Sequence, residues 1–232
     1  MVNLRVYAEG LGEYRFVQEV LLPHLARFDV YAQASLMGHL TKTPSGGTRN
    51  WDGRKGARRE LQLALQQSSD QYPLCVTTMV DFYALPGDWP NRPTASSLPK
   101  PERSSMVESG MLESMRTSLG DDQRVERFIP YVSLHEFEAL ILSRPEALLA
   151  EFTGCEEAIR NLKNDIGCAS PEDVNDHSDS APSKRIQRFL PGYSARKDAA
   201  AVNTLKAIGL EYLRNACPHF GQWLGRLESL TR

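Results

Sequence analysis

The stretch LRVYAEGLGEYRFVQEVLLPHLARFDVYAQASLM, residues 4–37, gives the clearest indication of the fold class. It opens with a short apolar run, residues 4–8, whose valine and tyrosine favour a β-strand. Apolar residues then recur at helical spacing between Phe16 and Leu25, and a second strand is expected from 30 to 37. A strand, a helix and another strand in this order are typical of a parallel α/β unit.

The alternation of strands and helices continues beyond this unit. A basic, glycine-containing loop at residues 42–59 leads into a helix, and the apolar, β-branched run 74–80 predicts a central strand. The segment 81–105 contains five prolines and is expected to form an irregular excursion from the domain. A further helix is predicted over 106–119.

The pattern ends with one more strand and a helical region. Residues 128–132 predict a strand, and Pro130 favours an edge position for it. A helix is expected over 134–142. The predicted fold is therefore α/β: a mostly parallel sheet with helices on both faces, residues 1–143, and a helical C-terminal extension, residues 144–232, packed on that core.

Composition and charge indicate which cellular compartment and which partners to expect. The formal net charge is -2, so nucleic-acid binding would have to come from a local basic patch. The apolar run before the first acid is too short for a secretory signal, and no stretch approaches the roughly 20 apolar residues that a membrane span needs. The four cysteines are scattered without a CxxC pair, as expected of reduced thiols. These features predict a cytoplasmic protein with no membrane partner.

Acidic residues follow the predicted strands where the strands end. Glu9 follows the first strand, Asp81 the central one, and Glu136 comes shortly after the strand at 128–132. Ligands of open parallel sheets bind beyond the carboxyl ends of the strands, so these carboxylates are expected to share one edge. Carboxylate oxygens are the ligands that Mg²⁺ or Mn²⁺ would take, and such ions can drive phosphodiester hydrolysis.

Each acid also has a purely structural interpretation. Glu13 falls in the first turn of a helix, where a negative charge is favourable. Asp81 could cap a turn by binding its own backbone. Ser133 and Glu136 have the spacing of a helix capping box, and both interpretations of Glu136 stay open. Glu138 is the next acid along and is the weaker candidate.

Basic residues offer candidate phosphate contacts, because guanidinium groups match phosphate geometry. The alternative for such a run is a solvated loop. Lys184 follows Ser183, a predicted helix N-cap, and is either a phosphate-neutralising residue or a surface lysine. Trp51 and Trp89 either stack on bases or anchor loops. The basic candidates for nucleic-acid binding are Arg49, Arg54, Lys55, Arg58 and Arg59.

Several long motifs resemble the DUF4276 family over nearly the whole chain: VYAEGLGEYRFVQEVLLPHL, VTTMVDFYALPGDWP, FIPYVSLHEFEALIL, APSKRI and IGLEYLRNACPHFGQWLGRLE. That family is grouped with the Toprim-like domains of OLD-type nucleases, topoisomerases and primases. The resemblance implies a Toprim/Rossmann-like sheet with an acidic Mg²⁺ site. It places the EGxxE glutamates on Glu9 and Glu13, the Toprim aspartate on Asp81, the SxxE glutamate on Glu136 and a basic residue on Lys184.

The chain departs from the Toprim pattern at two positions. The usual DxD motif is broken because Tyr83 stands where the second aspartate is expected. Asp88 would replace that metal ligand if its loop folded back. Gly12 stands where related chains often carry threonine or serine.

These features favour a Mg²⁺- or Mn²⁺-dependent nuclease acting on DNA or RNA, which the resemblance would make an effector of anti-phage defence. The alternative is a catalytically inactive regulatory subunit that docks on an AAA- or ABC-type ATPase. Hydrolysis of small nucleotide phosphates ranks last, because no motif forms a nucleotide-specific pocket. A homodimer is a further expected assembly.

Overall fold

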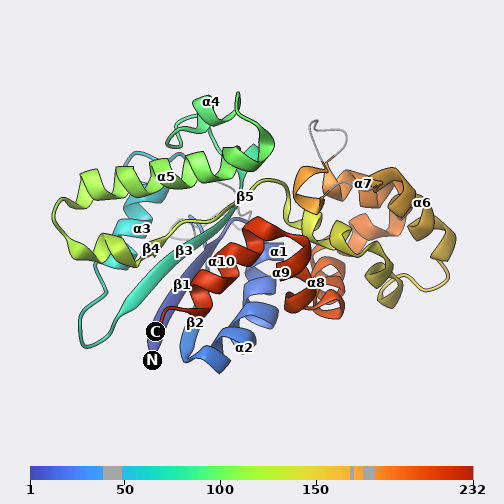
Figure 1. The fold of residues 1–232 in the computed structure, drawn as a ribbon, viewed down its shortest axis with the longest axis horizontal. Helices are drawn as coiled ribbons and strands as arrows, with labels where there is room; N and C mark the ends of the chain where they lie inside the picture. The colour runs from blue at the N-terminus through green and yellow to red at the C-terminus, as the bar shows by residue number, and fades with distance from the viewer. Residues whose placement is uncertain (39–48, 168–169, 175–180, 232) are drawn as a thin grey trace. The chain divides into compact units, whose positions relative to one another are not determined.

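The computed structural model describes residues 1–38, 49–167, 170–174 and 181–231 (Figure 1). The chain forms two compact units. Unit 1 comprises Met1–Leu134 and Arg226–Arg232, and unit 2 comprises His135–Gly225. The sequence suggested a division at residue 143 instead. Part of the predicted basic loop, residues 42–48, lies outside the described residues.

Unit 1 is built on a parallel sheet. Its strands are β1 (Val2–Ala8), β2 (Val30–Leu36), β3 (Leu74–Asp81), β4 (Phe128–Ile129) and β5 (Val132–Ser133). The order is β2-β1-β3-β4, with β5 also paired to β3, and every one of these pairings is parallel. Six consecutive residues of β3 are buried, as expected of a central strand covered on both faces.

Helices cover both faces of this sheet (Figure 1). One face carries α1 (Leu11–Phe16), a π-helical turn (Val17–Leu21) and α2 (Leu22–Leu25), which together form the expected first helix. The other face carries α3 (Ala57–Leu65) and α5 (Lys100–Leu119), whose apolar side chains pack with those of β3. The α/β class predicted from the sequence is thereby confirmed.

The proline-rich segment is more regular than predicted. It contains a 3-10 turn (Phe82–Ala84), α4 (Arg92–Ala95) and the first turn of α5. Both helices carry a proline among their first two residues. The missing N–H of proline costs nothing there, because the first N–H groups of a helix have no partner within it. The prediction of an irregular excursion was therefore wrong for these parts.

Pro130 divides the predicted last strand into β4 and β5 without changing its register on β3. Since proline has no N–H, the sheet hydrogen bonding is interrupted here. Thr78 of β3 fills the gap: its hydroxyl donates to the Tyr131 carbonyl at 2.9 Å and accepts from the Tyr131 N–H at 3.0 Å. A buried side chain thus replaces missing backbone pairing beside the end of β3.

Unit 2 is helical among its described residues, which confirms the predicted helical C-terminal region. The helix expected at 134–142 is instead a 3-10 segment, Phe137–Ser143. Residues 137–142 are all buried, so the segment lacks the polar face of a surface α-helix. The remaining elements are a 3-10 segment (Pro145–Ala150), α6 (Glu156–Ile166), a 3-10 turn (Pro171–Asp173), α7 (Pro182–Phe189), a 3-10 segment (Pro191–Arg196), α8 (Lys197–Ile208), α9 (Leu210–Ala216) and α10 (Pro218–Glu228), whose last residues belong to unit 1.

No helix in the described part of the chain is long and apolar enough to cross a membrane.

Because Thr78 bridges the interrupted strand pairing, replacing it should lower the stability of the protein. Thr78→Val keeps the side-chain shape but leaves the N–H and C=O of Tyr131 without the threonine hydroxyl. We expect the free energy of unfolding, measured by urea denaturation, to fall by about 1–3 kcal/mol. Thr94→Val, at an exposed position, serves as the control and should change it by less than about 0.5 kcal/mol. Equal stability of the two variants would contradict the bridging role.

Candidate functional site

Glu9 and Asp81 lie side by side at the carboxyl ends of β1 and β3. The pairing of Ala8 with Met79 continues one residue further, because the Glu9 N–H donates to the Met79 carbonyl at 3.1 Å. Oε2 of Glu9 accepts from the Asp81 N–H at 2.8 Å. The two acids that lie 72 residues apart in the sequence are therefore neighbours at one sheet edge.

Asp81 also has the structural role considered for it. Its Oδ1 accepts from the Tyr83 N–H at 2.9 Å and so caps the 3-10 turn that follows β3. Both carboxylates thus stabilise backbone where the strand ends. Each also remains half-exposed, so neither is sealed in the core.

Glu13 reaches back toward the turn between β1 and α1. It lies in the first turn of α1, and Gly10 is the N-cap residue in an extended conformation. A Cβ atom at Gly10 would stand 2.9 Å from Oε2 of Glu13. A side chain at position 10 would therefore displace the carboxylate, and glycine is what lets Glu13 approach the residue next to Glu9.

These acids do not provide a complete set of protein ligands for a metal ion. In residues 1–38, 49–167, 170–174 and 181–231, no group of three or more His, Cys, Asp or Glu side chains is arranged to hold an ion. Asp88, the proposed substitute for the missing second aspartate, binds backbone instead. Its Oδ2 accepts from the N–H of Trp51 at 2.8 Å and from that of Asp52 at 3.4 Å.

Two of the five basic candidates form contacts within their own segment of the chain. Arg49 donates from Nη2 to the Gly38 carbonyl at 2.5 Å, and Arg58 forms a 2.7 Å ion pair with Asp52. Gly38 has a φ of +84°, and a Cβ there would overlap the Arg49 guanidinium. These contacts give Arg49 and Arg58 structural roles that the sequence analysis did not foresee.

The other three basic candidates, Arg54, Lys55 and Arg59, are exposed. Trp51 and Trp89 are buried against each other, with ring centroids 5.0 Å apart. Of the two roles considered for the tryptophans, the structure shows loop anchoring. Among these five candidates, the exposed cationic side chains therefore lie in the turn before α3 and in the first residues of that helix.

Glu136 and Lys184 belong to unit 2. Oε2 of Glu136 accepts from the Ser183 N–H at 2.9 Å, so the glutamate side chain caps the start of α7. Glu136 therefore caps a distant helix, and not one that begins after Ser133 as the capping-box spacing suggested. Ser183 was predicted to be a helix N-cap, but it lies inside α7, whose N-cap residue is Ala181. Lys184 follows Ser183 directly and is exposed.

A charge cluster around Glu138 in unit 2 was underestimated from the sequence. Glu138 is 4% exposed, and its Oε1 lies 2.9 Å from Nζ of Lys197. Burial raises the pKa of Glu138 against the opposing effect of Lys197, and the negative charge of Glu136 raises it further. Burial raises the pKa of nearby Tyr193 too, and Glu138 and Asp198 add to that effect. The sequence signal for this cluster is the single acid, Glu138, inside the apolar run FEALIL.

The raised pKa of Glu138 predicts a pH-dependent effect of Glu138→Gln. The folded state binds this proton more tightly than the unfolded state, so the contribution of Glu138 to stability is present at low pH. It is lost as pH rises above the usual glutamate value of about 4.3 toward the raised pKa. The variant's free energy of unfolding relative to wild type should therefore increase between pH 4 and pH 7 in urea titrations.

The matched control for this titration is Glu102→Gln, which replaces an exposed acid of α5. It measures, over the same pH range, the effect of the same substitution where the carboxylate is exposed. A constant or falling difference for Glu138→Gln would show that Lys197 fully compensates the burial of the carboxylate.

Comparison with known proteins adds a family assignment. The family described as "Domain of unknown function (DUF4276)" matches residues 8–228. No curated protein and no solved structure matches the chain significantly. The match covers both units and includes Glu9, Asp81, Glu136 and Glu138. The chain therefore belongs to the DUF4276 family.

Proposed function

We propose that this protein is a Mg²⁺-dependent phosphodiester hydrolase of the Toprim-like type, acting on DNA or RNA. The observation that carries the proposal is the position of Glu9 beside Asp81 at the carboxyl edge of a parallel sheet, with 2.8 Å between the Glu9 carboxylate and the Asp81 N–H. This edge is where open α/β sheets bind their ligands. The resemblance of the EGLGE motif to that of OLD-type nucleases supports the same assignment.

The donor set at this edge suits a hard cation. Glu9 and Asp81 offer only carboxylate oxygens, and Mg²⁺ in proteins commonly takes one or two carboxylates while keeping several waters. A single ion held by these two residues fits the number of acids present. When bound, the ion would supply charge to polarise the phosphate and lower the pKa of a bound water.

The remaining residues would position the reactants. Glu13, folded back over Gly10, would orient the attacking water through its carboxylate. Exposed Arg54, Lys55 and Arg59 would contact the phosphate backbone of the substrate. We also propose that Glu136 and Lys184 of unit 2 take part in this reaction. This part of the proposal rests on the family resemblance alone. The same resemblance leads us to propose a role as an effector of anti-phage defence.

A nuclease assay tests this proposal. The protein is incubated with plasmid, single-stranded DNA and tRNA in Mg²⁺ or Mn²⁺. Glu9→Gln and Asp81→Asn should each lower the cleavage rate at least about 100-fold, because loss of a metal ligand should cost no less than loss of a supporting residue. Gln at position 9 keeps an oxygen that can accept from the Asp81 N–H, so the fold is preserved.

The matched control for the assay is Asp121→Asn, which replaces an exposed acid that follows α5. It should cleave at the wild-type rate. Cleavage that is unchanged in both Glu9→Gln and Asp81→Asn would refute the assignment of these residues.

A specific observation favours a second function, a catalytically inactive regulatory subunit docked on an ATPase. Tyr83 replaces the second Toprim aspartate, and Asp88 is bound to the backbone of Trp51. The described residues contain no three-ligand site. These features are expected of a protein in which Glu9 and Asp81 serve mainly to accept hydrogen bonds from backbone N–H groups.

Calorimetric titration with Mn²⁺ separates the two functions. The catalytic proposal predicts saturable binding of about one ion per chain, abolished by Glu9→Gln and Asp81→Asn. Asp88→Asn should leave the Mn²⁺ affinity unchanged, because its carboxylate holds the loop at Trp51. Absence of Glu9-dependent binding would favour the regulatory subunit.

A further inference from the structure

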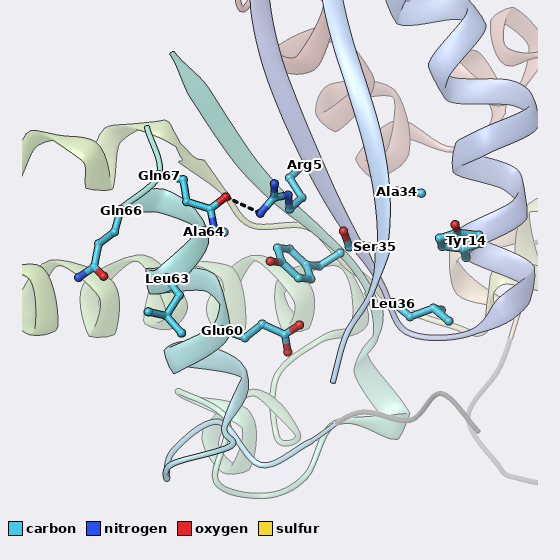
Figure 2. Close-up of a pocket in the computed structure, with 11 residues that line it drawn as sticks. Arg5, Tyr14, Ala34, Ser35, Leu36, Glu60, Leu63, Ala64, Gln66 and Gln67 are labelled. Carbon is cyan, nitrogen blue, oxygen red and sulfur yellow. Dashed lines mark hydrogen bonds between the residues drawn. The ribbon is translucent and has the colours of Figure 1, made fainter. Parts of the chain in front are cut away.

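A cavity of about 810 Å³ lies beside the edge strand β2 of unit 1 (Figure 2). None of Glu9, Glu13 and Asp81 lines it. The strand order puts β2 at the margin of the sheet, whereas the buried side of α3 packs with residues of β3. The sheet face beside α3 is thus incompletely covered at β1 and β2, and the cavity forms there.

The floor of the cavity is polar. Arg5 and Tyr7 are two residues apart on β1 and therefore lie on the same face of the sheet. Ser35 of β2 is the register partner of Tyr7 and extends this polar strip to the sheet margin. Arg5 and Ser35 are partly exposed at the cavity, whereas Tyr7 is 5% exposed and also packs in the core beside α3.

Two opposite charges flank the Tyr7 hydroxyl. Burial raises the pKa of Tyr7, and the two charges act on it in opposite directions: Arg5 lowers it and Glu60 raises it. Arg5 is oriented by donating from Nη1 to Oε1 of Gln67 at 3.1 Å, as Figure 2 shows. Glu60 is oriented by accepting from the Gly38 N–H at 2.8 Å. Both charged groups are held in place before any ligand arrives.

The wall of the cavity has an apolar part. Leu63 of α3 lies one turn from Glu60 and remains 38% exposed, although it is a leucine on a helix that packs on a sheet. Tyr14 of α1 also borders the cavity, but from the other side of β2 than Glu60 and Leu63 (Figure 2). Apolar walls with a few fixed polar groups are the usual composition of small-molecule sites, and the volume lies within their range of roughly 300–1,000 Å³.

We propose that this cavity binds a small molecule of about nucleotide size that carries an anionic group and N–H donors. The Arg5 guanidinium receives the anionic group, phosphate or carboxylate, through charge-assisted hydrogen bonds. The Glu60 carboxylate accepts from the N–H groups, and Leu63 covers the apolar body. Two sources share this chemistry: nucleoside monophosphates with an amino-bearing base, and zwitterionic peptides. The site is independent of the proposed metal chemistry.

Ligand-observed NMR and calorimetry in EDTA test the proposal with AMP, GMP and the dipeptide Ala-Gln as probes. We expect saturable binding of the nucleotides or of the dipeptide with a Kd below about 1 mM, and the better probe identifies the source. Arg5→Gln and Glu60→Gln should each weaken binding at least tenfold. Leu63→Trp adds bulk to the apolar wall without removing a polar group and should weaken binding at least tenfold.

The control is Arg27→Gln, which removes an exposed arginine of the 3-10 turn (Ala26–Phe28) after α2. It should bind like wild type. Absence of saturable binding by all three probes overturns the proposal, as does binding that survives in both Arg5→Gln and Leu63→Trp. Because no metal is present, this result stands whether or not the protein cleaves nucleic acid.

Discussion

The parallel pairing of β1 with β3 holds the sheet of unit 1 together and sets the position of the candidate site. β1 lies between β2 and β3, so its backbone is hydrogen-bonded on both sides along its length. The register brings Ala8 opposite Met79 and thereby sets the carboxyl ends of two strands at one edge. The position of Glu9 beside Asp81 follows from this register, since a shift of one residue would turn the side chains of the displaced strand to the other face.

The strand-end acids illustrate how structural and chemical roles overlap. Glu9 and Asp81 each bind a backbone N–H, which explains why acids are tolerated at this partly buried edge. The same hydrogen bonds fix the positions of both carboxylates. Preorganised oxygens of this kind are what a cation site requires, so the capping role does not argue against metal binding.

Unit 2 uses its acids in a different way. Glu136 caps α7, and Glu138 is buried in an ion pair with Lys197. The Glu138 side chain is 5% exposed and that of Lys197 is 39% exposed, so only the carboxylate of this pair is taken out of water. Removing Lys197 would leave the buried carboxylate without its opposite charge, which is costly. The ion pair joins the 3-10 segment Phe137–Ser143 to α8.

The sequence alone was enough to predict the alternation of strands and helices, because periodic apolar residues report which faces are buried. It also located Glu9 and Asp81 at strand ends, since both follow apolar runs directly. It could not reveal that Asp88 and Arg49 bind backbone, that Glu138 pairs with Lys197, or that a polar cavity lies beside β2. Those features depend on which segments meet in the folded chain. The partners leave no local pattern in the sequence: Asp88 and Trp51 are 37 residues apart, and Glu138 and Lys197 lie in different elements.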